Sequence, residues 1–291
     1  MTRLGGAVLA STVLMGLMTS SAIAGTVFSN ATAPGDAFAN PGASNQGQAI
    51  GATGWVYNNV RNAATVGIST ALPRSGNGSV SFASPNGAGK ADVEFLASPV
   101  QFGGNFFAVG SIGAFSSFSG MSYDWYRDGA STNPAAQHPA LRILLDLDGN
   151  LGTTSDRGGL VFERVYNGAP TPLNQWVSDT VTADTKLWNF GLGLGFEFDI
   201  DGDGTPYDTL AEWQASGRLQ NAVILGFSAG VGSGWNGAFS GAVDNIAWTI
   251  GNVTTTTNFE VPSETVVPEP ASLALLGLGL AGLALARRRR A

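Results

Sequence analysis

Short runs of alternating apolar and polar residues recur about every ten residues from Thr65 onward, with glycine-rich turns between them. In residues 91–95, for example, Val93 and Phe95 share one face and the acids beside them share the other. The 41 glycines and the charged fraction of 12% suit many short strands and tight turns better than long amphipathic helices. We expect strands over residues 78–82, 91–95, 121–126, 141–147, 159–166, 176–181, 192–200, 222–231 and 238–250.

One segment has the start and stop signals of a helix. Thr205 suits the N-cap, Pro206 the first helical position and Asp208 the first turn. The helix is expected to continue to about Ser216 and to end at Gly217. Roughly ten to twelve strands, one short helix and no βαβ rhythm favour an all-β fold, an antiparallel β-sandwich of jelly-roll type.

The first residues indicate export. Arg3 is followed by an apolar run over residues 4–18 and by the small residues Ala22 and Ala24, which is typical of a secretory signal helix. We expect translocation by the Sec machinery and cleavage after Ala24. The next stretch, residues 25–60, has little periodicity and is expected to be partly loop or an irregular first strand. The chain then divides into a signal peptide (1–24), a β-sandwich domain (25–252), a linker (253–266) and a sorting tail (267–291).

The C-terminal segment has three parts in order. A proline-rich motif precedes an apolar stretch over residues 271–286, and a basic cluster closes the chain. The apolar stretch reaches about 24 Å as a helix, short of a hydrocarbon core of about 30 Å, and snorkelling arginines help it to span. We expect a C-terminal transmembrane helix with the basic cluster in the cytoplasm. The motif is Pro268, Glu269 and Pro270, and the cluster is Arg287, Arg288, Arg289 and Arg290.

This order resembles the PEP-CTERM sorting signal of Gram-negative bacteria. The resemblance implies recognition by exosortase, a transient stay in the inner membrane, and release to the cell surface or the exopolysaccharide matrix. Residues 241–248 resemble the closing strand of extracellular jelly-roll domains and place the body among uncharacterised PEP-CTERM proteins. For the C-terminal segment, the alternative to a sorting signal is an ordinary membrane anchor behind a proline-rich linker.

Composition excludes several kinds of chemistry. The chain has no cysteine, so disulfides, thiolate nucleophiles and cysteine metal sites are ruled out. Its one histidine, His138, precedes a proline and is expected to be a loop residue rather than part of a catalytic relay. Residues 25–267 hold 9 basic and 20 acidic side chains, a net charge of −11. Such a body repels nucleic acid and attracts divalent cations.

The segment Asp199-Ile-Asp201-Gly-Asp203-Gly predicts a calcium loop, with Asp208 as a further ligand. Carboxylates at alternate positions, with glycines that let the backbone curl, wrap a hard cation in oxygen ligands. The spacing resembles EF-hand, dockerin and thrombospondin-repeat loops. The twelfth position, however, is Leu210 rather than an acid, and Glu212 comes two residues late. A solvated acidic turn is the alternative.

A second loop has the same start and is a weaker candidate for calcium. Asp146, Asp148 and Asn150 alternate around Gly149 after an apolar strand, and Asp156 follows. A plain turn explains Asp-Gly-Asn equally well.

Aromatic and acidic side chains leave two further functions open. Trp235 lies in a glycine-rich loop and is expected to be exposed, so it is our main candidate for a glycan platform, with Trp125 and Tyr126 behind it. Glu94 and Glu163 lie on strands and are expected at the surface rather than as a catalytic pair. The sequence therefore favours an exported, non-enzymatic surface or exopolysaccharide-matrix protein, stabilised by calcium. A glycan-binding module and a secreted polysaccharide-active enzyme are the alternatives.

Overall fold

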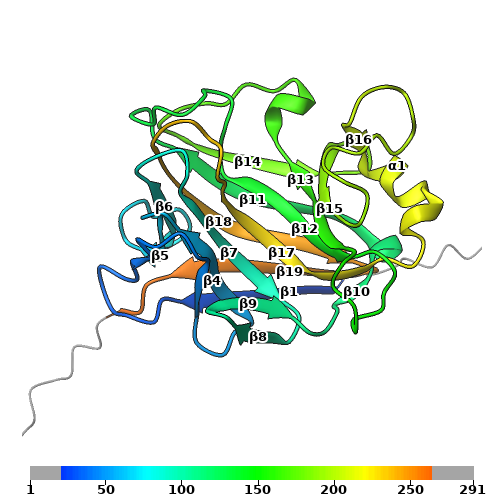
Figure 1. Cartoon of the computed structure of the whole chain (residues 1–291). Coiled ribbons are helices and arrows are strands. Elements are labelled where there is room, and N and C mark those ends of the chain that lie inside the picture. The colour runs from blue at the N-terminus through cyan, green and yellow to red at the C-terminus, as the bar shows by residue number, and fades with distance from the viewer. Residues whose placement is uncertain (1–20, 264–291) are drawn as a thin grey trace, which may run out of the picture.

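The computed structural model describes residues 21–263 as two β-sheets packed face to face (Figure 1). Residues 1–20 of the predicted signal peptide, the sorting motif, the predicted transmembrane helix and the arginine cluster lie outside the described residues. Among residues 21–263, no helix has the length and apolar character needed to span a bilayer. The predicted antiparallel β-sandwich with one short α-helix is confirmed.

The first sheet has eight strands, and β18 is central in it. One edge of β18 pairs with β11, and its other edge pairs with β6 and β19. All pairs are antiparallel except β1 with β19, so the described chain starts at one end of the sandwich and finishes at the other (Figure 1). The strands are β1 (Ser21–Phe28), β2 (Phe38–Ala39), β5 (Thr65–Ser69), β6 (Ser79–Ser84), β11 (Phe118–Arg127), β14 (Trp176–Val181), β18 (Phe239–Ile250) and β19 (Val253–Glu260).

The second sheet has nine strands in the order β16-β15-β13-β12-β17-β7-β4-β3, with β10 beside β17. A separate hairpin joins β8 (Pro99–Phe102) to β9 (Asn105–Ala108). The nine strands are β3 (Gln46–Ala49), β4 (Trp55–Arg61), β7 (Lys90–Leu96), β10 (Gly113–Ala114), β12 (Ala140–Asp146), β13 (Arg157–Phe162), β15 (Lys186–Gly191), β16 (Asp208–Thr209) and β17 (Val223–Val231).

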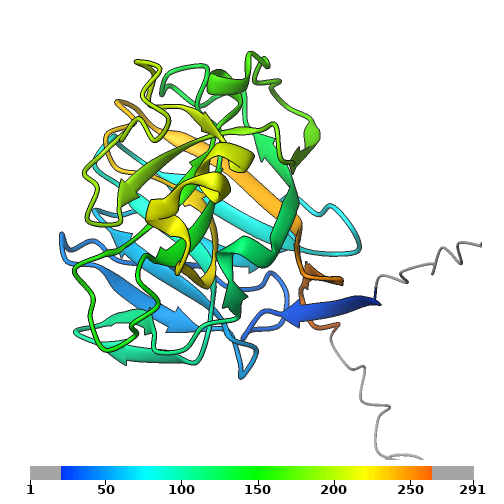
Figure 2. The same ribbon diagram turned by 90° about the vertical axis from the view of Figure 1, so that its right-hand side faces the viewer.

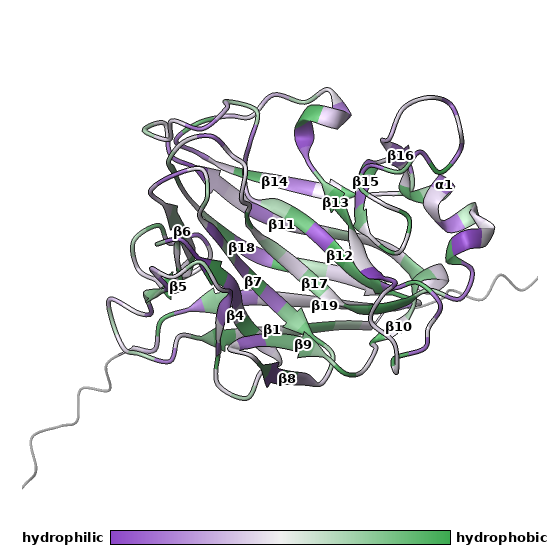
Figure 3. Ribbon diagram, in the orientation of Figure 1, coloured by the Kyte–Doolittle hydropathy of each residue, from purple (hydrophilic) through white to green (hydrophobic). Residues whose placement is uncertain are grey.

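Aromatic residues of the two inner faces meet in the core. Trp248 of β18 stacks on Phe227 of β17 with ring centroids 4.6 Å apart, and Trp55 of β4 meets Phe259 of β19 edge to face at 4.9 Å. Hydropathy alternates along the strands as the sequence predicted (Figure 3). Helix α1 (Leu210–Ala215) covers one end of the sandwich, where the fully buried Trp213 donates from Nε1 to Leu187 O at 3.1 Å (Figure 2).

The helix begins later than predicted. Asp208 and Thr209 pair with β15 as strand β16, so they are not available for the first helical turn. Thr209 is the N-cap instead, because its Oγ1 accepts from Glu212 N at 3.2 Å while its N donates to Glu212 Oε2 at 2.7 Å. The predicted end is close to the observed one, since Ser216 is the C-cap.

Three other expectations need correction. The strand predicted over residues 192–200 is wrong: β15 ends at Gly191, and Leu192 and Glu197 have positive φ values of 61° and 52°, which break a strand. Residues 253–260, placed in the linker, form β19 within the first sheet. Residues 21–24, the end of the predicted signal peptide, lie exposed in β1 beside β19, and cleavage after Ala24 stays a prediction. The described residues also hold 19 strands rather than ten to twelve, because several have only two to four residues.

Candidate functional site

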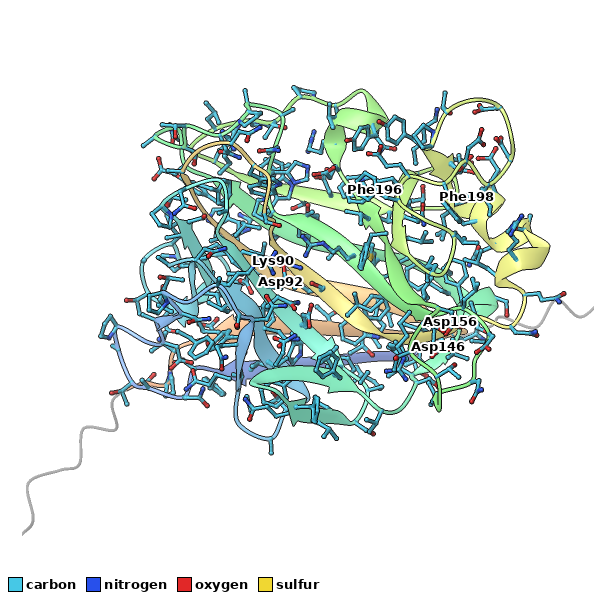
Figure 4. All side chains as sticks on the ribbon, in the orientation of Figure 1. Lys90, Asp92, Asp146, Asp156, Phe196 and Phe198 are labelled. Atoms are coloured by element: carbon cyan, nitrogen blue, oxygen red, sulfur yellow. The ribbon has the colours of Figure 1, made fainter. Side chains whose placement is uncertain are left out.

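The outer face of the second sheet carries a groove. On β7 the side chains of Lys90, Asp92 and Glu94 point outward, because the apolar residues between them point into the core. The strand register pairs Glu94 with Ser228 of β17, and Ser228 with Arg142 of β12. Residues paired across neighbouring strands lie on the same face. Side chains far apart in the sequence therefore meet on this surface, where Figure 4 labels Lys90 and Asp92.

Aromatic side chains of β15 line the same groove. Trp188 pairs with Val161 of β13, which pairs with Arg142, so Trp188 and Phe190 lie half-buried on the outer face. Phe196, which is 67% exposed, packs edge-on against Trp188 with ring centroids 5.2 Å apart. The groove has a volume of about 310 Å³ and is lined by Asn59, Lys90, Asp92, Glu94, Arg142, Leu144, Trp188, Phe190, Gly232 and Ser233.

Asp92 is held by two cations and an amide at the floor of the groove. Its carboxylate lies 2.8 Å from Arg142 Nη1 and 3.3 Å from Lys90 Nζ, and it accepts from Asn59 Nδ2 at 2.9 Å. Burial alone would raise the pKa of Asp92, but Lys90 and Arg142 lower it below its usual range. Asp92 is therefore an ionised, fully paired group that fixes the positions of the cations around it.

Glu94 lies on the outer face, as alternation predicts, but it is buried rather than at the surface. Asn58 Nδ2 donates to Glu94 Oε2 at 2.6 Å, and Asn59 Nδ2 donates to Oε1 at 3.1 Å. Burial, and then the charge of Asp92, raises the pKa of Glu94 to about 7. The side chain is 5% exposed, so little of it reaches the open part of the groove.

The other titratable candidates are also engaged by neighbours. Glu163 Oε2 accepts from Trp188 Nε1 at 3.0 Å, and burial raises the pKa of Glu163. His138 lies between β11 and β12 and is fully buried, stacked on Trp125 at 4.5 Å. Its Nε2 accepts from Arg164 N at 3.0 Å, and burial lowers the pKa of His138 to about 3. The imidazole is thus a neutral core group.

The loop between β15 and β16 brings its acids together. Carboxylate oxygens of Asp199, Asp201 and Asp203 lie within 4.8 Å of one another, and so do those of Asp201, Asp208 and Glu212. Glu212, which comes too late for an EF-hand, is brought close because Thr209 caps α1 and directs its first turn back to the loop. The oxygens fit a hard cation such as Ca²⁺, and calcium binding here stays a prediction.

Backbone donors already occupy the carboxylates of this loop. Asp199 accepts from Gly202 N at 2.6 Å and from Gly204 N at 2.7 Å, and the bond from Gly204 lowers the pKa of Asp199. Asp203 Oδ1 accepts from Thr205 N at 2.7 Å. Burial and the neighbouring acids raise the pKa of Asp208 to about 6. The loop is thus a set of turns that holds its shape through its own hydrogen bonds.

The loop between β12 and β13 also assembles as the sequence indicated. Carboxylate oxygens of Asp146, Asp148 and Asp156 lie within 4.8 Å of one another. Asp148 Oδ1 accepts from Asn150 N at 2.7 Å, so Asn150 contributes to the turn through its backbone. Metal binding at these residues likewise stays a prediction.

The exposure expected for the two tryptophans of the predicted glycan platform is wrong. Trp235 is only 9% exposed and packs against Phe239 at 5.1 Å. Trp125 is fully buried and donates from Nε1 to Asp179 Oδ2 at 2.7 Å. Tyr126 is half-buried beside Trp176. Trp188 and Phe190, which line the groove beside β7, were missed, although their alternation with Leu187 and Asn189 marks them as one face of a strand.

Comparison with known proteins identifies the tail. The model of the PEP-CTERM protein-sorting motif matches residues 266–290. The chain therefore carries this sorting signal, which confirms the resemblance seen in the sequence and indicates an exported protein that is processed at the membrane. No curated protein matches the chain.

Solved structures resemble the body only distantly. Carbohydrate-binding modules of the β-sandwich superfamily are 12% identical, with a TM-score of 0.32, over 71% of this chain and 56% of that one, so this chain spans little more than half its length. A family 11 carbohydrate-binding module from Clostridium thermocellum, in complex with a β-1,3-1,4-mixed-linked tetrasaccharide, is 12% identical over 70% of this chain and 94% of that one, with a TM-score of 0.37. The cellulose-induced protein Cip1 is 16% identical over 65% and 87%, with a TM-score of 0.31. No inference about a ligand follows from similarity at this level.

Proposed function

We propose that this exported chain acts without catalysis at the cell surface or in the exopolysaccharide matrix of a Gram-negative bacterium, where its groove binds polysaccharide. In this proposal the Sec machinery exports the chain and exosortase processes its tail, so that the body leaves the inner membrane. Calcium is included as a structural ion of the body. A matrix role with no specific sugar is the simpler form of the same proposal.

Polysaccharide binding is supported by one observation: aromatic rings and polar side chains with fixed positions line the same open groove. The half-buried rings of Trp188 and Phe190 offer apolar faces to the C–H side of a sugar ring. Lys90, Arg142 and Asn59 lie beside them with their positions set by Asp92. An apolar lining with a few preorganised polar groups is typical of small-molecule and saccharide sites.

Affinity electrophoresis tests this proposal. The full-length protein is run through gels that contain the exopolysaccharide of the source organism or a neutral β-glucan. We expect retardation by at least one polysaccharide and its loss in Trp188→Ala. Trp176→Ala is the matched control, since Trp176 is half-buried on the other sheet. Unchanged mobility in every gel, or equal retardation of both variants, would overturn the groove as a glycan site.

The absence of catalysis has its own test. Asp92 and Glu94 are the carboxylates of the groove, but each is held by neighbouring side chains and nearly fully buried. We expect no release of reducing ends when the protein is incubated with the polysaccharides that it retards. Release that disappears in Glu94→Gln would replace the binding role with a hydrolytic one.

A further inference from the structure

A buried carboxylate oxygen without a partner lies at the end of β12. Asp146 is fully buried, and its Oδ2 accepts from Arg157 Nε at 3.1 Å. Its Oδ1 has no hydrogen-bond partner, and it is the only carboxylate oxygen among the buried unpartnered side-chain atoms of residues 21–263. Buried charged groups in native proteins are almost always satisfied, so this oxygen calls for a ligand.

Two further carboxylates lie close to the carboxylate of Asp146. One carboxylate oxygen of each of Asp146, Asp148 and Asp156 lies within 4.8 Å of the other two. Figure 4 labels Asp146 and Asp156 in this cluster. Calcium binds oxygens at about 2.3–2.6 Å, so two ligands on opposite sides of one ion are about 4.8 Å apart. The three carboxylates therefore lie close enough together to share one ion.

The turn that brings them together is fixed by its backbone. Gly149 has a φ of 74°, and a Cβ there would lie 2.8 Å from Asn221 O, so this position requires glycine. Asp148 N donates to Asp156 Oδ2 at 3.1 Å, which ties the far side of the loop to the near side. Asp148 is exposed and Asp156 half-buried, so the cluster opens to solvent on one side.

The local charge fits a divalent ion. Three carboxylates and the guanidinium of Arg157 leave two negative charges, which one divalent cation neutralises. Arg157 also donates to Ala108 O at 3.0 Å and to Leu151 O at 3.1 Å, so its guanidinium is anchored away from Asp146 Oδ1. It orients the carboxylate from behind, as outer partners of metal ligands commonly do.

We infer that the loop of residues 146–156 binds one divalent cation, Ca²⁺ by its all-oxygen donor set, through Asp146, Asp148 and Asp156. This site is separate from the groove and from the acidic loop before α1. Its occupancy joins the end of β12 to the start of β13 and supplies the partner that Asp146 Oδ1 lacks in the protein alone.

Calcium titration of the full-length protein in detergent tests this site. The protein is stripped with chelator and titrated with CaCl₂ by isothermal titration calorimetry. We expect that Asp148→Asn and Asp156→Asn each remove one binding event or weaken it about tenfold or more, because each deletes a charged ligand. Asp184→Asn makes the same charge change at an exposed turn and is expected to bind as the wild type does.

Both acidic positions are accessible, so neither substitution is expected to prevent folding, and the far-ultraviolet circular dichroism spectrum checks this. Identical titrations for the wild type and for both loop variants would overturn the inference, as would a wild type that binds no calcium. Polysaccharide retardation is measured on the same variants. It is expected to persist in them, so failure of the calcium site leaves the proposed function standing.

Discussion

The two acidic loops share the pattern Asp-x-Asp-Gly followed by Asp or Asn, yet the fold gives them opposite surroundings. In the loop before α1, the oxygens of Asp199 are occupied by two backbone amides, and the turn is exposed. In the loop after β12, Asp146 is fully buried and one of its oxygens has no partner. The sequence favours the first loop because it holds more acids. The structure favours the second, because burial without a partner indicates a ligand more strongly than the number of carboxylates does.

We expect the largest effect from a substitution of the buried carboxylate, that of Asp146. Asp146→Ala leaves Arg157 without its ion pair, and removing one partner of a buried pair typically costs about 3–5 kcal/mol. We expect a loss of this size in the free energy of unfolding, measured by urea denaturation. Asp199→Ala, at a half-buried carboxylate in an exposed turn, is expected to lose far less. Equal losses in the two variants would contradict the contrast between the loops.

The carboxyl of Glu94 is buried like that of Asp146, but both of its oxygens accept hydrogen bonds. It therefore shows the effect of burial without an unpartnered oxygen. Its pKa is raised from 4.5 to about 7, so the native state keeps a proton that the unfolded chain releases. The free energy of unfolding is therefore expected to fall by up to about 3 kcal/mol as pH rises from 4.5 to above 7. Glu94→Gln mimics the protonated form, and we expect it to flatten this fall and to be the more stable protein at pH 8. If the variant keeps the pH profile of the wild type, the pKa of Glu94 is not raised in the native state.

The smallest effect concerns the cap that brings Glu212 to the exposed loop. Thr209→Ala removes the capping hydroxyl of α1, which typically costs about 1 kcal/mol. We expect this change in thermal unfolding, with little change in calcium binding if the exposed loop is held by its own hydrogen bonds. A large loss of calcium binding in this variant would show instead that Asp208 and Glu212 form an ion site, and the ranking of the loops would be reversed.

Local patterns account for what the sequence could predict. Alternation of Val93 and Phe95 was sufficient to place β7 and its two faces, because a strand with one buried face has period two. The start of α1 was missed, because the pairing of Asp208 with Leu187 depends on a strand more than 20 residues away. Nothing local predicts a long-range pairing of this kind.

The candidate sites divide in the same way. The acids of both loops are close in sequence, so their clustering was predictable from spacing. The groove was not, since Asp92 meets Arg142 only through the order and register of β7, β17 and β12. The burial of Asp146, and with it the difference between the loops, likewise depends on how the second sheet packs.

The most direct measurement is a crystal structure of the protein grown in CaCl₂, with anomalous data to locate the ions. We predict an ion about 2.3–2.6 Å from Asp146 Oδ1, with Asp148 and Asp156 among its other ligands. An ion at residues 199–212 together with a water molecule, and no cation, on Asp146 Oδ1 would contradict the account.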